Sequence, residues 1–257
     1  PHDERYARAS EFMDVVKGFW ASESFHYKGH YYEANGMGLR GALRKAQLPV
    51  ICTAGSSDAA RDLAAKHADY YLMLAEDPAV VAETIADVRR RAEVYGRADT
   101  IRFGLSVDVI LRETDEEAFA EAKRVFDSGV AAGTVQIAAE RTGQMSQTHQ
   151  SRYRRYLGRA INGYEDLFIA PNLWAGFSYV GIPPGFAFVG SYAAVEARVR
   201  EFAALGISKF FINGYPHLEE IYRLGEHLLP RFRASAQPSV ANDLQPIPLV
   251  AGLSGGN

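Results

Sequence analysis

The chain has 257 residues, a formal net charge of −3 at pH 7 and 47% hydrophobic residues. This composition is typical of one globular domain with a sizeable core, and the charge gives no reason to expect nucleic-acid binding. No apolar run reaches the roughly 18 residues needed to span a bilayer, and Cys52 has no second cysteine with which to form a disulfide. We therefore expect a cytoplasmic protein without membrane contact.

The first 20 residues predict a helix, because apolar side chains recur at helical spacing. His2 and Tyr6 lie four residues apart and share one face near the helix start, where they could bind a ligand or simply cap and pack that end. Alternating aromatic residues predict a hairpin within residues 23–48, of which residues 39–48 are read as a loop. The predicted buried stripe of the helix consists of Phe12, Val15, Val16, Phe19 and Trp20.

A strand, a tight turn and a helix follow the hairpin. Residues 50–54 are apolar and predict a buried strand, in which Cys52 is expected to be a packed thiol rather than a nucleophile. Gly55 allows a tight turn, and Ser56 and Ser57 lead into a helix for which Ser57 is the natural N-cap. Free N–H groups and the positive end of a helix dipole attract anions, so this turn predicts a phosphate site. An ordinary capped turn is the alternative.

Two further strands are predicted at residues 69–74 and 102–111, and a helix with an Asp-Pro start follows the first of them. In the second strand, Ser106 and Asp108 point the same way because side chains alternate along a strand. A carboxylate among β-branched neighbours indicates either a polar cavity or an edge strand with Asp108 in water.

The next segments differ in regularity. Residues 114–117 have the form of a capping box and predict a helix, and residues 136–157 predict weaker helices. Residues 168–188 mix glycine, proline and aromatic residues and predict a long loop, either a lid over a site or a poorly ordered connection. Residues 191–205 then predict a helix, and residues 207–213 a fourth strand.

The C-terminal part begins with a turn at residues 214–217. A last helix at residues 218–229 should be stopped by Pro230, and residues 234–257 predict an extended C-terminal tail. Strands that alternate with helices imply a parallel sheet, and a (β/α)8 barrel keeps its site at the carboxyl ends of such strands. Only four strands can be counted, whereas that barrel needs eight.

Several motifs resemble the bacterial luciferase-like flavin-dependent monooxygenases, and within them most closely the alkanesulfonate monooxygenases. Each motif is weak by itself, whereas their combination and order along the chain are specific. The matching stretches are His2-Asp3-Glu4-Arg5-Tyr6 with Glu11-Phe12, Ala54-Gly55-Ser56-Ser57-Asp58-Ala59-Ala60, Arg112-Glu113-Thr114-Asp115-Glu116-Glu117, Ala170-Pro171-Asn172-Leu173-Trp174-Ala175-Gly176, Phe188-Val189-Gly190 and Gly214-Tyr215-Pro216-His217-Leu218-Glu219-Glu220.

The resemblance implies an α/β fold, namely a (β/α)8 TIM barrel of the luciferase-like type. This chain would cover the later part of the barrel, about four βα units plus insertions, over residues 1–233, with a mobile-loop insertion at residues 168–188. A half barrel would expose a strand edge and an apolar face. We therefore expect additional polypeptide, before Pro1 or from another chain, to supply the first four strands and the remaining flavin contacts.

The activity implied by the resemblance is that of a two-component monooxygenase. A separate NAD(P)H-dependent flavin reductase would deliver reduced FMN, and O2 would add to it to form a C4a-peroxyflavin. Oxidation of a small organosulfur substrate would then release sulfite and an aldehyde if that substrate is a sulfonate. A homo-oligomer, dimer or tetramer, is implied, and no metal is expected. By the motif match, the cofactor-binding residues are His2, Tyr6, Gly55, Ser56 and Ser57, with the two serines on the FMN phosphate.

The predicted catalytic residues are Tyr215, Asp108 and Ser106. Tyr215 matches the active-site tyrosine of the family, whereas Ser106 and Asp108 stand where the alkanesulfonate enzymes carry Arg-x-His. Those enzymes also carry an arginine near the position of Gly181. Cations suited to a sulfonate are therefore missing, so the flavin chemistry is better supported than the sulfonate. The alternatives are a deazaflavin (F420)-dependent oxidoreductase of the same fold and a non-catalytic flavin-binding protein.

Overall fold

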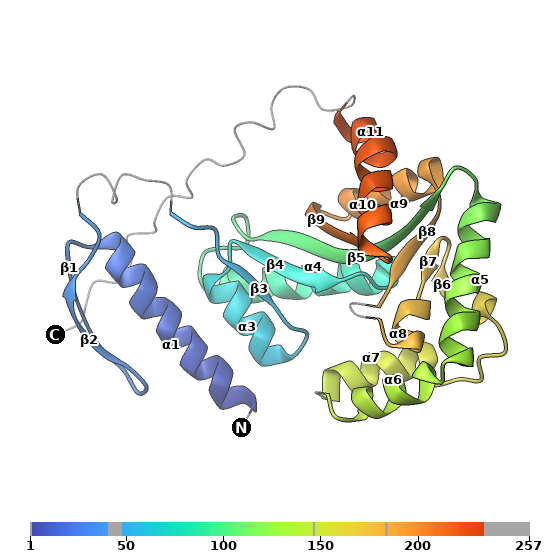
Figure 1. Ribbon diagram of the computed structural model, residues 1–257. Coiled ribbons are helices and arrows are strands. Elements are labelled where there is room, and N and C mark those ends of the chain that lie inside the picture. The colour runs from blue at the N-terminus through green and yellow to red at the C-terminus, as the bar shows by residue number, and fades with distance from the viewer. Residues whose placement is uncertain (1, 41–47, 146, 183–184, 234–257) are drawn as a thin grey trace.

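Figure 1 shows a computed structural model of the chain, with a seven-stranded sheet at its centre and helices packed along that sheet. A long helix and a two-stranded hairpin lie to one side of it. No helix in the described part of the chain is long and apolar enough to cross a bilayer. The predicted tail and most of the predicted loop after the hairpin lie outside the described residues. The described residues are 2–40, 48–145, 147–182 and 185–233.

Five parallel strands form the body of the sheet. β5 (Arg102–Arg112) lies in the middle and pairs with β4 (Tyr70–Leu74), with β9 (Ile207–Gly214) and, at its C-terminal end, with β8 (Ala187–Ser191). Among the described strands, β3 (Cys52–Ala54) pairs with β4 alone and forms an edge. The parallel order confirms the predicted α/β architecture as an open half-barrel sheet. The four predicted strands are present, and β8 is a fifth that sequence reasoning missed.

The edge position of β3 corrects two expectations. Cys52 and Ala54 are exposed, so the strand is only partly covered and the Cys52 thiol is not packed. The physical reason is that an edge strand has a neighbour on one side only. The central position of β5 excludes the alternative of an edge strand with Asp108 in water, because Asp108 is only 2% exposed.

Helices follow the parallel strands, and their starts are set by short-range hydrogen bonds that the sequence predicts. In each helix of this group, a polar side chain at the N-cap accepts a hydrogen bond from a backbone N–H of the first turn. At Thr114, Glu117 also completes the capping box. The helices and their caps are α3 (Asp58–His67) with Ser57, α4 (Pro78–Glu93) with Asp77, α5 (Asp115–Ala131) with Thr114 and α9 (Tyr192–Ala204) with Ser191.

The core lies between the sheet and these helices. β5 is buried on both faces, as expected for a central parallel strand, and Phe103, Leu105 and Val107 are fully enclosed. The predicted apolar stripe of α4 is buried along its length and consists of Val81, Ile85, Val88 and Ala92. Burial of these side chains supplies the main stabilisation of this half of the molecule.

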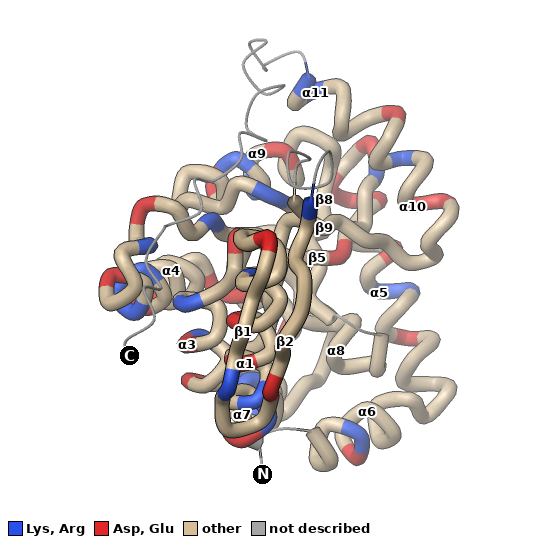
Figure 2. Tube along the Cα trace, turned by 90° about the vertical axis from the view of Figure 1, so that its left-hand side faces the viewer, with Lys and Arg blue, Asp and Glu red and all other residues tan. Residues whose placement is uncertain are grey.

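The N-terminal part is joined to the sheet largely through polar contacts. α1 (His2–Ala21) packs beside α3, and the hairpin of β1 (Ser24–Lys28) and β2 (Glu33–Met37) lies in front of the sheet in Figure 2. Lys17 donates a hydrogen bond to the carbonyl of His67 at 2.8 Å. The carboxylate of Glu11 accepts from the backbone N–H groups at the hairpin turn. The predicted stripe of α1 is only half-buried, and Phe12 is exposed.

The segment predicted as a long loop, residues 168–188, is structured over most of its length. It contains β6 (Phe168–Ala170), β7 (Leu173–Trp174) and α8 (Gly176–Val180), and β7 pairs antiparallel with β8. Trp174 and Phe177 are fully buried, and the Trp174 indole N–H donates to the carbonyl of Tyr164 at 3.0 Å. The loop interpretation is therefore wrong for this part, because its aromatic residues belong to the core. Movement of the segment stays a prediction.

Three helical elements precede this segment: α6 (Thr134–Gly143), α7 (Gln147–Leu157) and the 3-10 turn η1 (Tyr164–Leu167). They confirm the prediction of helices around residues 136–157. α6 contacts both α5 and α8, and α7 contacts α6, so these helices form a layer below the sheet in Figure 1.

At the C-terminal end, the prediction that Pro230 stops the last helix is wrong. α10 (His217–Arg223) continues through a π-helical turn, Leu224–Leu228, into α11 (Leu229–Arg233). The wide turn resets the backbone hydrogen bonds, so Pro230 falls in the first turn of α11, where its missing N–H is tolerated.

Candidate functional site

The predicted site segments lie at the carboxyl edge of the parallel strands. The turn of Gly55 and Ser57 follows β3, Ser106 and Asp108 lie within β5, and Tyr215 follows β9. Since β3, β4, β5 and β9 run parallel, their carboxyl ends share one edge of the sheet, which is where barrel folds build their sites.

The turn after β3 has the geometry of an anion cradle. Gly55 adopts a φ of +130°, and a Cβ there would lie 2.8 Å from the Cβ of Ala60 and 2.9 Å from the Tyr6 hydroxyl. Glycine is therefore required for this close approach. The Ser57 hydroxyl accepts from the Ala60 N–H at 3.3 Å, which leaves its own proton to donate. Ser56 is exposed at the same turn.

Polar atoms without partners flank this turn. The Thr53 hydroxyl on β3 and the Arg61 Nε on α3 are buried and have no hydrogen-bond partner among the described residues. Arg61 also forms an ion pair with Asp87 on α4, at 3.0 Å. Buried polar atoms of this kind are normally satisfied by water or a ligand. The residues present therefore fit a phosphate group at the turn.

The structure brings Tyr6 to the turn, since its hydroxyl lies against Gly55, whereas its role in lining the flavin stays a prediction. His2 begins α1, and its side chain lies outside the described part of the chain. Sequence reasoning missed Tyr71, whose hydroxyl donates to the Gly55 carbonyl at 2.5 Å and whose pKa is raised by burial. A signal was available, because an aromatic hydroxyl in a buried strand needs a hydrogen-bond partner and β4 pairs directly with β3.

Asp108 is a buried carboxyl group that holds the segment before β8. Its Oδ2 accepts from the Gly185 N–H at 3.3 Å, and its own N–H donates to the Phe186 carbonyl at 2.9 Å. Burial raises the pKa of Asp108 to about 6, while the Gly185 hydrogen bond and the nearby His217 oppose that rise. These backbone contacts are the polar surroundings that the structure shows for Asp108, and a polar cavity there stays a prediction. A catalytic role for Asp108 stays a prediction.

Ser106 and Tyr215 are more accessible than Asp108. Ser106 is half-buried on β5, two residues before Asp108, and so shares its face. Tyr215 is 43% exposed, and its ring lies in edge-to-face geometry with the rings of Phe177 and His217. The turn that carries Tyr215 is tied down by a hydrogen bond between His217 Nδ1 and the Gly214 carbonyl at 2.5 Å.

A buried ion cluster supports the Tyr215 turn from behind. Glu220 on α10 is fully buried and accepts from the Leu111 N–H at 3.0 Å, from Arg112 at 2.5 Å and from Arg223 at 2.8 Å. This cluster joins α10 to the end of β5. Sequence reasoning placed Glu220 in a motif but gave it no role, because two of its partners, Leu111 and Arg112, lie more than 100 positions away in the chain.

Comparison with known proteins adds the family. The family described as luciferase-like monooxygenase matches residues 1–209. A riboflavin lyase with modified FMN and riboflavin has 20% identity and a TM-score of 0.67, covering 95% of this chain and 62% of that one. EDTA monooxygenase from Chelativorans sp. BNC1 has 18% identity and a TM-score of 0.67, covering 92% and 61%. An F420-dependent tetrahydromethanopterin reductase from Methanopyrus kandleri has 16% identity and a TM-score of 0.51, covering 86% and 61%.

These structural likenesses show a shared fold, and the chain spans about three fifths of the length of each of the three solved chains. The family match carries further, because it extends over most of the chain and includes the turn after β3 and the positions of Ser106 and Asp108 on β5. The chain belongs to the luciferase-like monooxygenase family.

Proposed function

We propose that this chain is part of an FMN-dependent, two-component monooxygenase. The observation that carries the proposal is the Gly55–Ser57 turn, where a glycine cradle, a capped helix start and unpartnered polar atoms meet. When bound, reduced flavin would supply the electrons that activate O2 for transfer of one oxygen atom to a substrate. A separate NAD(P)H-dependent flavin reductase as electron source and a homo-oligomeric assembly are parts of the proposal.

The residues of the turn would bind and orient the cofactor. Ser56 and Ser57 donate hydroxyl protons to the phosphate, and the first N–H groups of α3 add the positive end of its dipole. Tyr6 lies beside Gly55 and would line the flavin. Arg61 carries a positive charge next to the turn, which favours a dianion over a neutral group.

Asp108 and Tyr215 would act on the substrate side. With a pKa of about 6, Asp108 can hold or release a proton near neutral pH. In this conformation its carboxyl is occupied by Gly185, so contact with a substrate requires the segment around Gly185 to move. Tyr215 is exposed at the strand edge and can donate its hydroxyl proton without such a movement.

The finer assignment to alkanesulfonates has weaker support from the residues. Asp108 and Ser106 supply no positive charge, and a sulfonate beside an ionised Asp108 would be repelled. The proposed substrate is therefore a small organosulfur or amphiphilic compound, and short alkanesulfonates should be poor substrates. Efficient sulfite release from a short alkanesulfonate by the unmodified protein would overturn this assignment.

Phosphate binding can be tested with paired serine variants. The double substitution of Ser56 and Ser57 to alanine should weaken FMN binding at least about tenfold, because charge-assisted hydrogen bonds are each worth about 1.5 kcal/mol or more. Ser191→Ala is the matched control, since Ser191 caps α9 with the same 3.3 Å geometry but away from the turn. Riboflavin, which lacks the phosphate, should bind equally to all forms. Equal FMN affinity in the double variant would refute the phosphate site.

Oxygen consumption separates the candidate functions. With reduced FMN and a screen of organosulfur substrates, the full-length protein should consume O2 and release oxidised product. A protein that instead oxidises or reduces a substrate with F420 and no O2 is the deazaflavin alternative, whose fold is shared by the reductase compared above. Flavin binding without turnover over the whole screen would identify a non-catalytic flavin-binding protein.

A further inference from the structure

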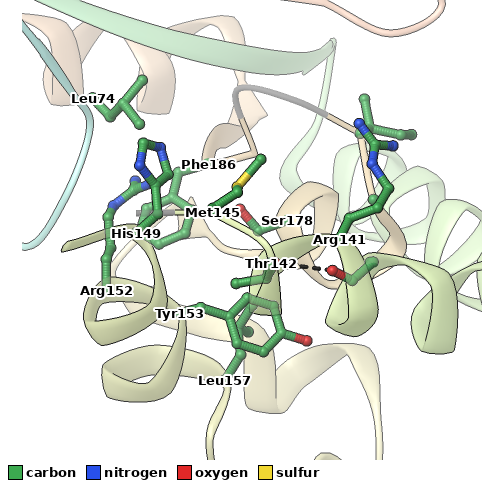
Figure 3. A pocket seen from close by; sticks show the side chains of 13 residues that line it. Leu74, Arg141, Thr142, Met145, His149, Arg152, Tyr153, Leu157, Ser178 and Phe186 are labelled. Carbon is green, nitrogen blue, oxygen red and sulfur yellow. Dashed lines mark hydrogen bonds between the residues drawn. The ribbon is translucent and has the colours of Figure 1, made fainter. Parts of the chain in front are cut away.

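A separate pocket of about 280 Å³ lies between the end of β4 and the helices α6, α7 and α8 (Figure 3). Its size is close to the lower limit of small-molecule sites, at about 300 Å³, so it suits a small ligand. It opens beside the strand edge already described, because Leu74 on its wall pairs with Ser106 and the carbonyl of Phe186 accepts from the Asp108 N–H.

The ionisable groups that line the pocket are all basic. Arg141, His149 and Arg152 line it, and none of its lining residues is acidic. Over most of the chain, acidic and basic residues are interspersed (Figure 2), whereas residues 141–164 include five arginines and no Asp or Glu. An unbalanced stretch of this kind attracts anions.

Arg152 is held in place at one end of the pocket. Its guanidinium lies 3.8 Å from the ring centroid of Phe186 and donates to the Ala75 carbonyl at 2.8 Å. Its Nε forms an ion pair with a Glu76 carboxylate oxygen at 3.5 Å, and Glu76 also forms an ion pair with Arg155 at 3.3 Å. The Arg152 Nε is buried without a hydrogen-bond partner among the described residues. The guanidinium at this end of the pocket is therefore held in place, and Glu76, which it shares with Arg155, balances its positive charge only in part.

Two further polar groups, His149 and Arg141, line the pocket. His149 lies beside Arg152 in Figure 3, and burial together with Arg152 lowers its pKa, so it faces the pocket as a neutral donor or acceptor near pH 7. Arg141 lies at the opposite end, is exposed, and forms no ion pair with the other described residues. An exposed arginine opposite a fixed one supplies a second cation for an anionic group.

The rest of the lining is apolar and would accept a hydrocarbon body. The lining residues with large apolar groups are Leu74, Met145, Tyr153, Leu157, Ile182 and Phe186. We propose that this pocket binds a small organic anion, a carboxylate or sulfonate with an apolar body, through Arg141 and Arg152. As a substrate site it rests on the proposed function, whereas anion binding itself does not. Arginines on α6 and α7 would thus bind the anionic group, and Ser106 and Asp108 on β5 would not.

Calorimetric titration of the full-length protein without flavin tests the pocket, with octanoate, octanesulfonate, octanol and octylammonium as probes. Both anions should bind at least about tenfold more tightly than octanol, since a charge-assisted bond to arginine is worth about 1.5 kcal/mol or more. Octylammonium should not bind. Arg141→Gln should weaken the anions about fivefold and leave octanol unchanged, and Arg141→Glu should weaken them further. Arg141 is exposed, so neither variant threatens folding.

Arg154→Gln is the matched control, because Arg154 lies on the same helix but does not line the pocket. Equal binding of octanol and the anions, or anion binding unchanged in Arg141→Glu, would overturn the proposal. These outcomes are separate from the flavin tests. FMN binding without anion binding would refute the pocket alone, and anion binding without FMN binding would refute the proposed function alone.

Discussion

The region around β5 and the N-terminal part of the molecule have similar apolar sequence patterns but differ in how far their side chains are buried. Around β5, the strand and the facing helices enclose large side chains such as Phe103 and Phe177 completely. In the N-terminal part, no described residue before Ala60 is buried, although α1 carries an apolar stripe at helical spacing. α1 is instead joined to α3 by polar contacts, including the ion pair of Asp14 with Lys66 at 2.7 Å.

The difference shows what periodicity can and cannot tell. Apolar spacing identifies the face of a helix or strand that would pack, but burial requires a second surface to cover that face. β5 has neighbours on both sides and helices over it, whereas β3 is an edge strand in the described structure. The same distinction predicts where substitutions should be costly.

The largest effect is expected from truncating a central side chain. Phe103→Ala on β5 should lower the free energy of unfolding by about 3–5 kcal/mol, because it empties an enclosed site. Phe12→Ala on α1 is the comparison, since Phe12 is 49% exposed, and it should change that free energy by less than about 1 kcal/mol. Urea unfolding followed by circular dichroism measures both. Equal losses would mean that the two regions are covered to the same extent in solution.

The next effect concerns the buried carboxyl of Asp108. Because its pKa in the folded state is about 6 and its ordinary value is 3.8, the group favours folding below pH 4 and loses that contribution as the pH rises through 6. Asp108→Asn does not titrate and keeps an oxygen for the Gly185 N–H. Its stability relative to the unmodified protein should rise by about 2.4 kcal/mol between pH 4 and pH 7.5. A constant difference across this range would contradict a buried, titrating Asp108.

A smaller effect of opposite sign is expected at the junction of the two regions. His67 on α3 is 2% exposed, and burial with Lys17, Lys66 and Arg97 nearby lowers its pKa to about 3. Its neutral form accordingly stabilises the fold above pH 6.5, and this contribution is lost as the pH falls. Relative to His67→Gln, the unmodified protein should lose about 2 kcal/mol between pH 7.5 and pH 5. Parallel pH profiles of the two proteins would show that His67 is accessible to water.

The smallest effect separates the two serines of the turn. Ser57→Ala removes the cap of α3 and should lower the free energy of unfolding by about 1 kcal/mol. Ser56 is exposed, so Ser56→Ala should change it by less than about 0.5 kcal/mol. Thermal unfolding of the two variants in the absence of FMN measures both effects. A larger loss of stability in Ser56→Ala than in Ser57→Ala would show that Ser57 is not the residue that caps α3.

Much of the fold follows from the sequence, because the decisive interactions are short in range. The caps at Ser57, Asp77 and Thr114 and the glycine turn at Gly55 join residues within a few positions of each other. The same local signals predict a phosphate site at the turn after β3, and the structure shows the glycine turn and the Ser57 cap on which that prediction rests.

The rest was decided by tertiary structure, because it depends on residues that are distant in the chain. Glu220 finds the end of β5 across more than 100 residues, and the aromatic residues of the predicted loop become core only when β7 pairs with β8. The anion pocket likewise needs α6, α7 and the end of β4 to meet. Residues 141–164 contain five arginines and no Asp or Glu, but only the packed helices bring Arg141 and Arg152 to one pocket, since a charge pattern carries no information about which surfaces face each other.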